Sequence, residues 1–239
     1  MPERPSLSLC MIVRDERRYL PRCLKSIEGL VDEIVVVDTG SQDGTDDLAR
    51  DWGARVFYEP WKGDFSLARN ASLARASGDW ILVLDADEEL VGGRETLSEL
   101  LRAPDDVEGY LLTIESPTHE EPGSQVLVHL NLRLFRRRPE YKFTGMIHEQ
   151  LLPSIVAARP GARILEAPVV IRHHGYLSAN NAAKAARNRS ILSQALLTDP
   201  DNAFLRYHLG VTCYQSGDYR GAVEQFWPLY HRLNPEVSF

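Results

Sequence analysis

The stretch WILVLDAD, residues 80–87, joins an unbroken apolar run to two aspartates that are separated by one residue. An apolar run of this kind predicts a strand covered on both faces, as in a parallel sheet flanked by helices. Ligands bind such sheets beyond the carboxyl ends of the strands, which is where Asp85 and Asp87 lie. The stretch therefore predicts an α/β fold with a polar site at the edge of its sheet.

The residues before this stretch alternate between strand and helix patterns. We expect strands over residues 7–13, 33–37 and 55–58, and helices near 21–30, after Thr45 and over 66–77. Thr45 is expected to cap the second helix. This alternation with short connections implies right-handed crossovers and a parallel sheet. Glu16 and Asp38 also follow strand ends, so we expect them at the same edge as Asp85 and Asp87.

The rest of the chain is less regular. We expect strands over residues 109–115, 126–136 and 163–172, and a mobile loop over 116–125. From about residue 178 the pattern is helical, and residues 202–235 resemble one tetratricopeptide repeat through Leu209, Gly210, Tyr219, Ala222 and Phe226. We therefore expect a domain over residues 1–177 and a helical tail over 178–239. The one repeat must either pack on the preceding helix or be followed by more chain beyond Phe239.

The composition excludes several classes of protein. The chain has 239 residues, a formal net charge of −7 and three cysteines. The negative charge argues against nucleic-acid binding, and the wide cysteine spacing argues against disulfides and structural zinc and fits a reducing cytosol. No apolar run approaches the roughly 20 residues of a membrane span, and the N-terminus does not resemble a signal peptide. We interpret the basic run Arg136–Arg138 as a solvated strand end rather than a phosphate or membrane-surface contact.

Asp85-Ala86-Asp87 is the sharpest chemical signal. Two carboxylates at the end of a buried strand can share Mg²⁺ or Mn²⁺, which prefer few carboxylates plus phosphate oxygens. A metal there would bridge a diphosphate and neutralise charge on a leaving group. Asp38 is either a cap for its own loop or an acceptor for a base N–H or a ribose hydroxyl. Glu16 could play a similar part from the neighbouring strand.

Three further residues are candidates for the same chemistry. Arg69 either holds phosphate oxygens through two parallel hydrogen bonds or forms a surface ion pair. His173, after the last expected strand, is either a metal or diphosphate contact or a buried structural histidine. Glu149 is a candidate base that would take the proton from an acceptor hydroxyl or thiol, and Glu120 and Glu121 compete for that role.

Ordered motifs carry a family resemblance. Motifs of dinucleotide enzymes, P-loop NTPases and α/β-hydrolases are missing from the sequence. The stretches LSLCMIVRDERRYLPRCLKSI, EIVVVDTGSQDGT and FSLARNASLARASGDWILVLDADEEL resemble the nucleotide-binding half of family 2 glycosyltransferases. The later LRLFRRRPEYKFTGMIHEQ and IRHHGY resemble a bacterial branch that often carries tetratricopeptide repeats.

The resemblance implies a fold and an activity. The fold would be GT-A, a Rossmann-like, mostly parallel sheet with a nucleotide-binding half over residues 1–90 and an acceptor-side half over 91–177. The activity would be inverting transfer of a sugar, usually from a UDP-sugar, with Mn²⁺ or Mg²⁺.

The resemblance also assigns roles to the candidate residues. Asp38 and Glu16 would hold the nucleoside, and Arg69 would face the diphosphate. Asp85 would lie near the ribose or the metal. The remaining roles fall to Asp87 as a metal ligand, His173 rather than His174 as a metal or phosphate contact, and Glu149 as the base.

Two other functions compete with this one. A nucleotidyltransferase would usually show a glycine-rich basic loop after the first strand, where this chain has Arg14-Asp15-Glu16-Arg17-Arg18. A non-catalytic module would bind proteins through the helical tail, but the intact Asp85-Ala86-Asp87 and Asp38 argue against degeneration. We expect a cytoplasmic protein, free or peripheral to a membrane, whose acceptor is a saccharide, a lipid-linked glycan or a protein.

Overall fold

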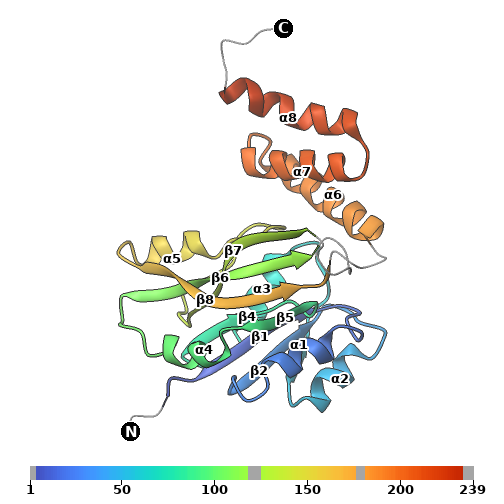
Figure 1. The fold of residues 1–239 in the computed structure, drawn as a ribbon. Helices are drawn as coiled ribbons and strands as arrows, with labels where there is room; N and C mark the ends of the chain where they lie inside the picture. The colour runs from blue at the N-terminus through green and yellow to red at the C-terminus, as the bar shows by residue number, and fades with distance from the viewer. Residues whose placement is uncertain (1–3, 118–124, 176–180, 234–239) are drawn as a thin grey trace. The chain divides into compact units, whose positions relative to one another are not determined.

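The computed structural model describes residues 4–117, 125–175 and 181–233, which fold into two compact units (Figure 1). The first unit contains the sheet and is formed by Met1–Gly145 and Glu149–Ser178. The second unit contains the C-terminal helices together with Met146–His148. All of the candidate site residues that the structure describes lie in the first unit.

The first unit is built on one sheet with the strand order β3-β2-β1-β4-β7-β6-β8-β5. Its strands are β1 (Leu7–Val13), β2 (Glu33–Asp38), β3 (Arg55–Tyr58), β4 (Trp80–Val83), β5 (Glu88–Gly92), β6 (Val107–Pro117), β7 (Val126–Arg136) and β8 (Arg163–His173). Neighbouring strands are parallel, except that β7 is antiparallel to β4 and β6, and β5 is antiparallel to β8. The sheet is therefore mixed but mostly parallel, as predicted, and the carboxyl ends of β1, β2, β4, β6 and β8 share one edge.

Helices cover both faces of the sheet. They are α1 (Leu20–Ser26), α2 (Thr45–Asp51), α3 (Phe65–Leu73), α4 (Arg94–Leu100) and α5 (Leu152–Ala158). Leu9 and Met11 of β1 are buried with residues of α1, α2 and α4. Cys10, between them, is buried on the opposite face with Leu73 of α3 and Ile155 of α5. Because both faces are covered, the central strands are unbroken apolar runs in the sequence.

Some local predictions are wrong. Elements β5, α4 and α5 were not predicted, and β5 exists through its pairing with β8 rather than through a strand pattern of its own. Thr45 does not cap α2: the cap is Gly44, whose φ of 81° is in the left-handed region that favours glycine. The Thr45 hydroxyl instead donates to the Asp43 carboxylate.

The basic run Arg136–Arg138 is only in part a solvated strand end, because Arg137 is exposed whereas Arg136 and Arg138 are half-buried. The Arg136 guanidinium lies 4.7 Å from the ring centroid of Trp80 and donates to the carbonyl oxygen of Val107 at 2.9 Å. Arg137 donates to the carbonyl oxygen of Gly78, and Arg138 donates to the carboxylate of Glu108. All three side chains therefore make hydrogen bonds within the fold, although Arg137 remains exposed.

The second unit contains α6 (Asn181–Thr198), α7 (Ala203–Gln215) and α8 (Tyr219–Leu233), and α7 packs against both α6 and α8. Gly210 of α7 lies against the ring of Phe226, so that an added Cβ would come within 2.5 Å of it. This close approach lets α7 and α8 pair as a tetratricopeptide-like hairpin that packs on the preceding helix, as predicted. Within the described residues, none of the helices has the length and apolar character that crossing a membrane requires.

Glu108 allows a test of the packing in the first unit. Its side chain is fully buried at the start of β6 and accepts from Tyr141 at 2.7 Å and from Arg138 at 3.1 Å. Burial acts to raise the pKa of Glu108, but the hydrogen bonds from Arg138 and Tyr141 outweigh it and lower the pKa.

We expect Glu108→Gln to lower the free energy of unfolding by about 2 kcal/mol at neutral pH, because buried donors lose a charged acceptor. The contribution of Glu108 is present above the unfolded-state pKa of about 4.3 and is lost as the pH falls through the lower folded-state pKa. Urea unfolding of both proteins at neutral and acidic pH measures the difference. If the two proteins differ in free energy of unfolding as much in acid as at neutral pH, Glu108 does not stabilise the fold as a charged acceptor.

Candidate active site

The strand ends bring the predicted residues to one edge of the sheet. Asp38 is the last residue of β2, beside the end of β1. Asp85 and Asp87 follow β4 and lead directly into β5, whose first residue, Glu88, pairs with His173 at the end of β8. Strand pairing thus gathers residues from three separate parts of the sequence.

Asp38 has one satisfied carboxylate oxygen and one unsatisfied one. Its side chain is 1% exposed, and Oδ1 accepts from the backbone N–H groups of Gly40 at 2.8 Å and Ser41 at 2.7 Å. Oδ2 is buried and has no hydrogen-bond partner. Because a buried oxygen without a donor is costly, Oδ2 has the setting of an acceptor for a ligand. The structure therefore shows the loop cap, and the role of the same side chain as a ligand acceptor stays a prediction.

Hydrogen bonds connect the loop after β1 to the loop after β2, which follows Asp38. The Asp15 N–H donates to Ser41 Oγ at 3.0 Å, and the Glu16 N–H donates to Thr45 Oγ1 at 2.8 Å. Asp15 has a φ of 55°, which is unfavourable for a residue other than glycine by about 1 kcal/mol or more. The hydrogen bonds between the loops hold this conformation and place the half-buried Glu16 next to the end of β2.

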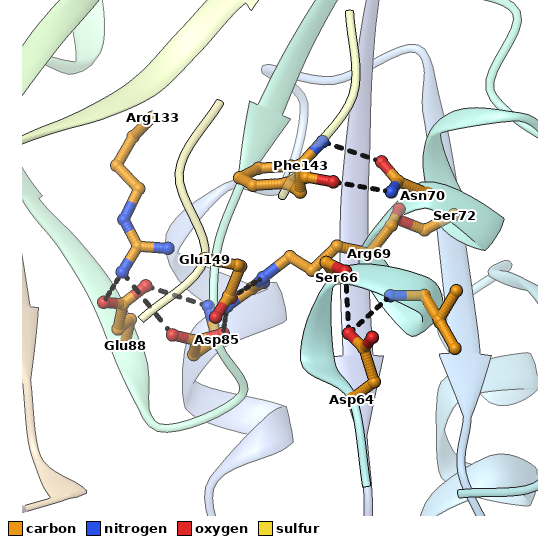
Figure 2. A network of polar contacts seen from close by, with 11 residues as sticks. Asp64, Ser66, Arg69, Asn70, Ser72, Asp85, Glu88, Arg133, Phe143 and Glu149 are labelled. Atoms are coloured by element: carbon orange, nitrogen blue, oxygen red, sulfur yellow. Dashed lines mark hydrogen bonds and ion pairs between the residues drawn. The ribbon is translucent and has the colours of Figure 1, made fainter. Parts of the chain in front are cut away.

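Arg69 joins two acidic residues beyond β4 (Figure 2). Asp64 caps α3 by accepting from the Leu67 N–H, and Arg69 lies farther along the same helix. Arg69 Nε donates to Glu149 Oε1 at 2.7 Å, and Nη2 donates to Asp85 Oδ1 at 2.6 Å. The residue is 7% exposed and its Nη1 is buried without a partner. Arg69 is therefore a buried cation, and the alternative of a surface ion pair is wrong.

Glu149 has a partner that the sequence did not predict. Its side chain is 11% exposed, and Oε1 is occupied by Arg69. An antiparallel bridge between Thr144 and Gln150 closes the segment that carries it. A role for Glu149 as a proton acceptor therefore requires Oε2 or a shift of the ion pair.

Arg133 and Glu88 belong to the same network and were missed by the sequence analysis. Arg133 Nη2 donates to Glu88 Oε1 at 2.6 Å and lies 3.5 Å from Asp85 Oδ2. Glu88 Oε2 accepts from the Asp85 N–H at 2.8 Å. The available signals were a charged residue between two leucines of an apolar strand and a glutamate directly after Asp87.

The network shifts the pKa values of the half-buried Asp85 and the buried Glu88 in opposite directions. Burial acts to raise the pKa of Asp85, but the charges of Arg69 and Arg133 outweigh it and hold that pKa well below its ordinary value. Burial raises the pKa of Glu88; the charge of Arg133 opposes this effect and the charge of Asp85 adds to it. Asp85 is therefore ionised at neutral pH, with its oxygens directed toward two guanidinium groups.

Asp87 and His173 form a separate pair at the end of β8. His173 Nε2 lies 3.5 Å from Asp87 Oδ2, and His173 Nδ1 lies 3.3 Å from Ser116 Oγ. Burial acts to lower the pKa of His173, but the hydrogen bond and charge of Asp87 outweigh it and raise the pKa. Gly175 packs so closely that an added Cβ would lie 2.3 Å from Asp87 Oδ2 and 2.5 Å from His173 Nε2.

The Asp87–His173 pair fits a divalent cation. A carboxylate oxygen and an imidazole nitrogen 3.5 Å apart can bind one ion, and Mg²⁺ or Mn²⁺ takes its other ligands from phosphate and water. In the described part of the chain, no group of three or more His, Cys, Asp or Glu side chains converges as a metal site. The contacts of Asp85 with the arginines favour Asp87 and His173 over Asp85 as ligands.

The remaining candidates lie elsewhere. His174 Nε2 is 3.0 Å from Glu89 Oε2, and its Nδ1 is 3.4 Å from Arg22, so its ring has partners outside the Asp87–His173 pair. This placement agrees with the preference for His173. Glu120 and Glu121, the alternative bases, lie outside the described residues.

Comparison with known proteins identifies the family. Residues 8–122 match the family described as glycosyl transferase family 2. The lipopolysaccharide core biosynthesis glycosyltransferase LpsC of Rhizobium meliloti is 34% identical over 182 residues, which cover 72% of this chain and 66% of LpsC. The chain belongs to glycosyltransferase family 2.

Another relative of this family 2 glycosyltransferase chain is named for tetratricopeptide repeats. A TPR repeat-containing protein of Synechococcus elongatus is 42% identical over 222 residues, which cover 90% of this chain and 54% of that protein. The family 2 chain therefore spans about half to two thirds of the length of these two curated relatives.

A solved structure supports the fold of the family 2 chain. The mannosyltransferase PcManGT from Pyrobaculum calidifontis, solved in complex with GDP-Man and Mn²⁺, has a TM-score of 0.60 and 16% sequence identity, and the match covers 100% of this chain and 77% of that one. At this identity the similarity concerns the fold alone. The fold is GT-A, as the sequence resemblance implied.

The fit of Gly175 gives a test of the Asp87–His173 pair. We expect Gly175→Ala to weaken Mn²⁺ binding in the presence of UDP by about tenfold or more, because the methyl group must displace one of the two side chains. Isothermal titration with MnCl₂ measures the affinity. Gly161→Ala is the matched control, since nothing lies within 4 Å of its added Cβ. Equal affinities in the two variants would contradict the role of the pair.

Proposed function

We propose that this chain is a metal-dependent, inverting glycosyltransferase that moves a sugar from a nucleoside diphosphate onto an acceptor hydroxyl or thiol. The observation that carries the proposal is the combination, at one sheet edge, of the unpartnered Asp38 oxygen with the Asp87–His173 pair. A nucleotide-sugar needs both features: an acceptor for its nucleoside and a site that balances its diphosphate charge.

Asp38 favours uridine as the nucleoside. Its Oδ1 is already used by two backbone N–H groups, so only Oδ2 remains to accept from a ligand. The uracil edge offers one ring N–H, which matches one acceptor oxygen, whereas guanine offers two adjacent donors. Glu16, half-buried at the neighbouring loop, is assigned to the same nucleoside.

Asp87 and His173 are assigned to Mn²⁺ or Mg²⁺. Two protein ligands leave most coordination positions for diphosphate oxygens and water, which suits these hard cations. When bound, the ion would act as a Lewis acid that neutralises charge on the departing diphosphate. Asp85, held by two arginines, is assigned to the ribose side rather than to the metal.

Arg69 is assigned to the diphosphate. Its Nη1 is buried without a partner, and a phosphate oxygen would accept from it. The guanidinium is already oriented by Glu149 and Asp85, so it needs little reorganisation to stabilise negative charge on the leaving group. This arrangement favours the transition state, in which that charge develops, over the ground state.

Glu149 is assigned as the base. The acceptor oxygen or sulfur attacks the anomeric carbon on the face opposite the diphosphate. The new glycosidic bond forms as the bond from the anomeric carbon to the diphosphate oxygen breaks, and the nucleoside diphosphate leaves with the electron pair. The acceptor proton passes to Glu149 Oε2 while Oε1 remains with Arg69, and the configuration at the anomeric carbon is inverted.

The rival functions predict other outcomes. A nucleotidyltransferase would release pyrophosphate, whereas the proposed reaction releases UDP. The loop after β1 has no glycine and is fastened to the loop after β2, which does not fit a flexible phosphate-binding loop. A non-catalytic module would need none of the buried charges around Asp85.

The wider assignments are part of the same proposal. We assign the nucleotide-binding half to residues 1–90, the acceptor-side half to 91–177, and acceptor or protein docking to the helical tail, 178–239. The acceptor is a saccharide, a lipid-linked glycan or a protein, and the site of action is the cytoplasm or its membrane surface. Because the chain spans part of its relatives, these assignments concern the protein that contains it.

We expect Asp87→Ala to reduce transfer roughly a thousandfold or more, because several kcal/mol of charge stabilisation are lost. Release of UDP from a panel of UDP-sugars measures turnover, and thermal unfolding reports whether the fold is intact. Wild-type protein treated with EDTA should behave like the variant. Transfer by Asp87→Ala in the presence of EDTA would defeat the metal role.

We expect Asp38→Asn to weaken UDP binding by about 10- to 100-fold, because an amide NH₂ replaces one acceptor oxygen with a donor. Titration of wild-type protein with UDP and with GDP, each with MnCl₂, tests the preference for uridine. Asp32→Asn is the control, since Asp32 accepts from the Leu7 N–H at the opposite end of β1. Unchanged UDP affinity in Asp38→Asn, or a wild-type preference for GDP, would rule out this nucleoside assignment.

A further inference from the structure

Glu88 and Arg133 form a buried ion pair within the network around Asp85 (Figure 2). Their side chains are 2% and 10% exposed, and Arg133 Nη2 lies 2.6 Å from Glu88 Oε1. A buried ion pair often stabilises a fold no better than apolar residues of the same size, because the cost of desolvation offsets the attraction. General stability therefore does not account for a pair placed at the turn that carries both aspartates.

Glu88 makes two hydrogen bonds with Asp85 across the turn that contains Ala86 and Asp87. Its backbone N–H donates to the carbonyl oxygen of Asp85 at 3.0 Å, and its Oε2 accepts from the Asp85 N–H at 2.8 Å. The two hydrogen bonds run in opposite directions between the same two residues. They limit the conformations of Ala86 and Asp87, which lie between them.

Arg133 orients both acids of the turn. The nitrogen that donates to Glu88 also lies 3.5 Å from Asp85 Oδ2, while Arg69 occupies Asp85 Oδ1. Asp85 is thus held between two guanidinium groups that come from α3 and β7. Its carboxylate is kept directed toward the arginines.

Glu88 also connects the turn to His173. The two residues are direct partners in the β5–β8 pairing, and the N–H of His174 donates to the carbonyl oxygen of Asp87 at 2.8 Å. A shift of Glu88 would therefore change the separation of Asp87 and His173, because one precedes Glu88 in the chain and the other lies opposite it.

We propose that Glu88 and Arg133 are positioning residues that hold Asp87 and His173 at the separation required to bind a divalent cation. The inference rests on the proposed function, in which those two side chains hold Mn²⁺ or Mg²⁺. Residues behind the metal ligands commonly change metal affinity 10- to 100-fold when they are substituted. Glu88 and Arg133 act on Asp87 and His173 through the backbone, by the turn that carries Asp87 and by the strand pairing with His173.

The test is Glu88→Gln, which keeps the size of the side chain but offers one acceptor oxygen to the two donors of Arg133 and Asp85. We expect the Kd for Mn²⁺ in the presence of UDP to rise by about 10- to 100-fold, measured by isothermal titration with MnCl₂. Asp38 and its loop are untouched, so binding of UDP without metal should weaken less than binding of Mn²⁺. Arg133→Lys, which keeps the charge but loses the guanidinium fork, should weaken Mn²⁺ binding in the same direction and serves if Glu88→Gln does not fold.

Glu108→Gln is the matched control. Glu108 is equally buried and paired with arginine, but it lies at the start of β6, away from the carboxyl ends of the strands. We expect this variant to lose stability and to bind Mn²⁺ like the wild type. Wild-type Mn²⁺ affinity in both Glu88→Gln and Arg133→Lys, or an equal loss in Glu108→Gln, would overturn the inference. A wild-type protein that binds UDP but no Mn²⁺ would instead overturn the metal site on which it rests.

Discussion

Buried charge at the edge of the sheet is the constraint on which the site depends. Arg69 and Arg133 are both almost fully buried, and a guanidinium in that position is tolerable only where carboxylates face it. Asp85, Glu88 and Glu149 supply those carboxylates. The five groups come from α3, β5, β7 and two connecting segments, so electrostatic pairing fixes the relative positions of elements that the apolar core alone would leave adjustable.

The part of the site assigned to the nucleoside is held by hydrogen bonds rather than by buried ion pairs. Around Asp38 the loops are held by hydrogen bonds between backbone amides and short side chains. Such a loop pair has its shape before any ligand arrives, which reduces the entropy lost on binding. The left-handed conformation of Asp15 is part of that preformed shape.

The sequence was sufficient for the elements whose pattern is local. The strands over residues 7–13, 55–58 and 126–136 have the bounds that their apolar patterns predicted, because covered or alternating runs reflect their own burial. Strand β5 depends on a partner far along the chain, so its sequence alone gave no strand pattern. The same reason explains the site: Asp38 and Asp87 stand at visible strand ends, whereas the roles of Arg133 and Glu88 arise only when β7 lies beside β4 and β5 beside β8.

The arginines at the end of β7 have a consequence for how the molecule meets an anionic ligand. Arg136 and Arg138 are half-buried and face carbonyl oxygens, the Trp80 ring and Glu108, so Arg137 is the exposed cation of the three. The chain as a whole carries a net charge of −7. A doubly charged phosphate compound therefore approaches against a long-range repulsion and feels local attraction only close to the site. Dissolved salt screens that repulsion over about 8 Å at physiological ionic strength. Raising the ionic strength should therefore increase the rate at which the anionic ligand associates with the protein.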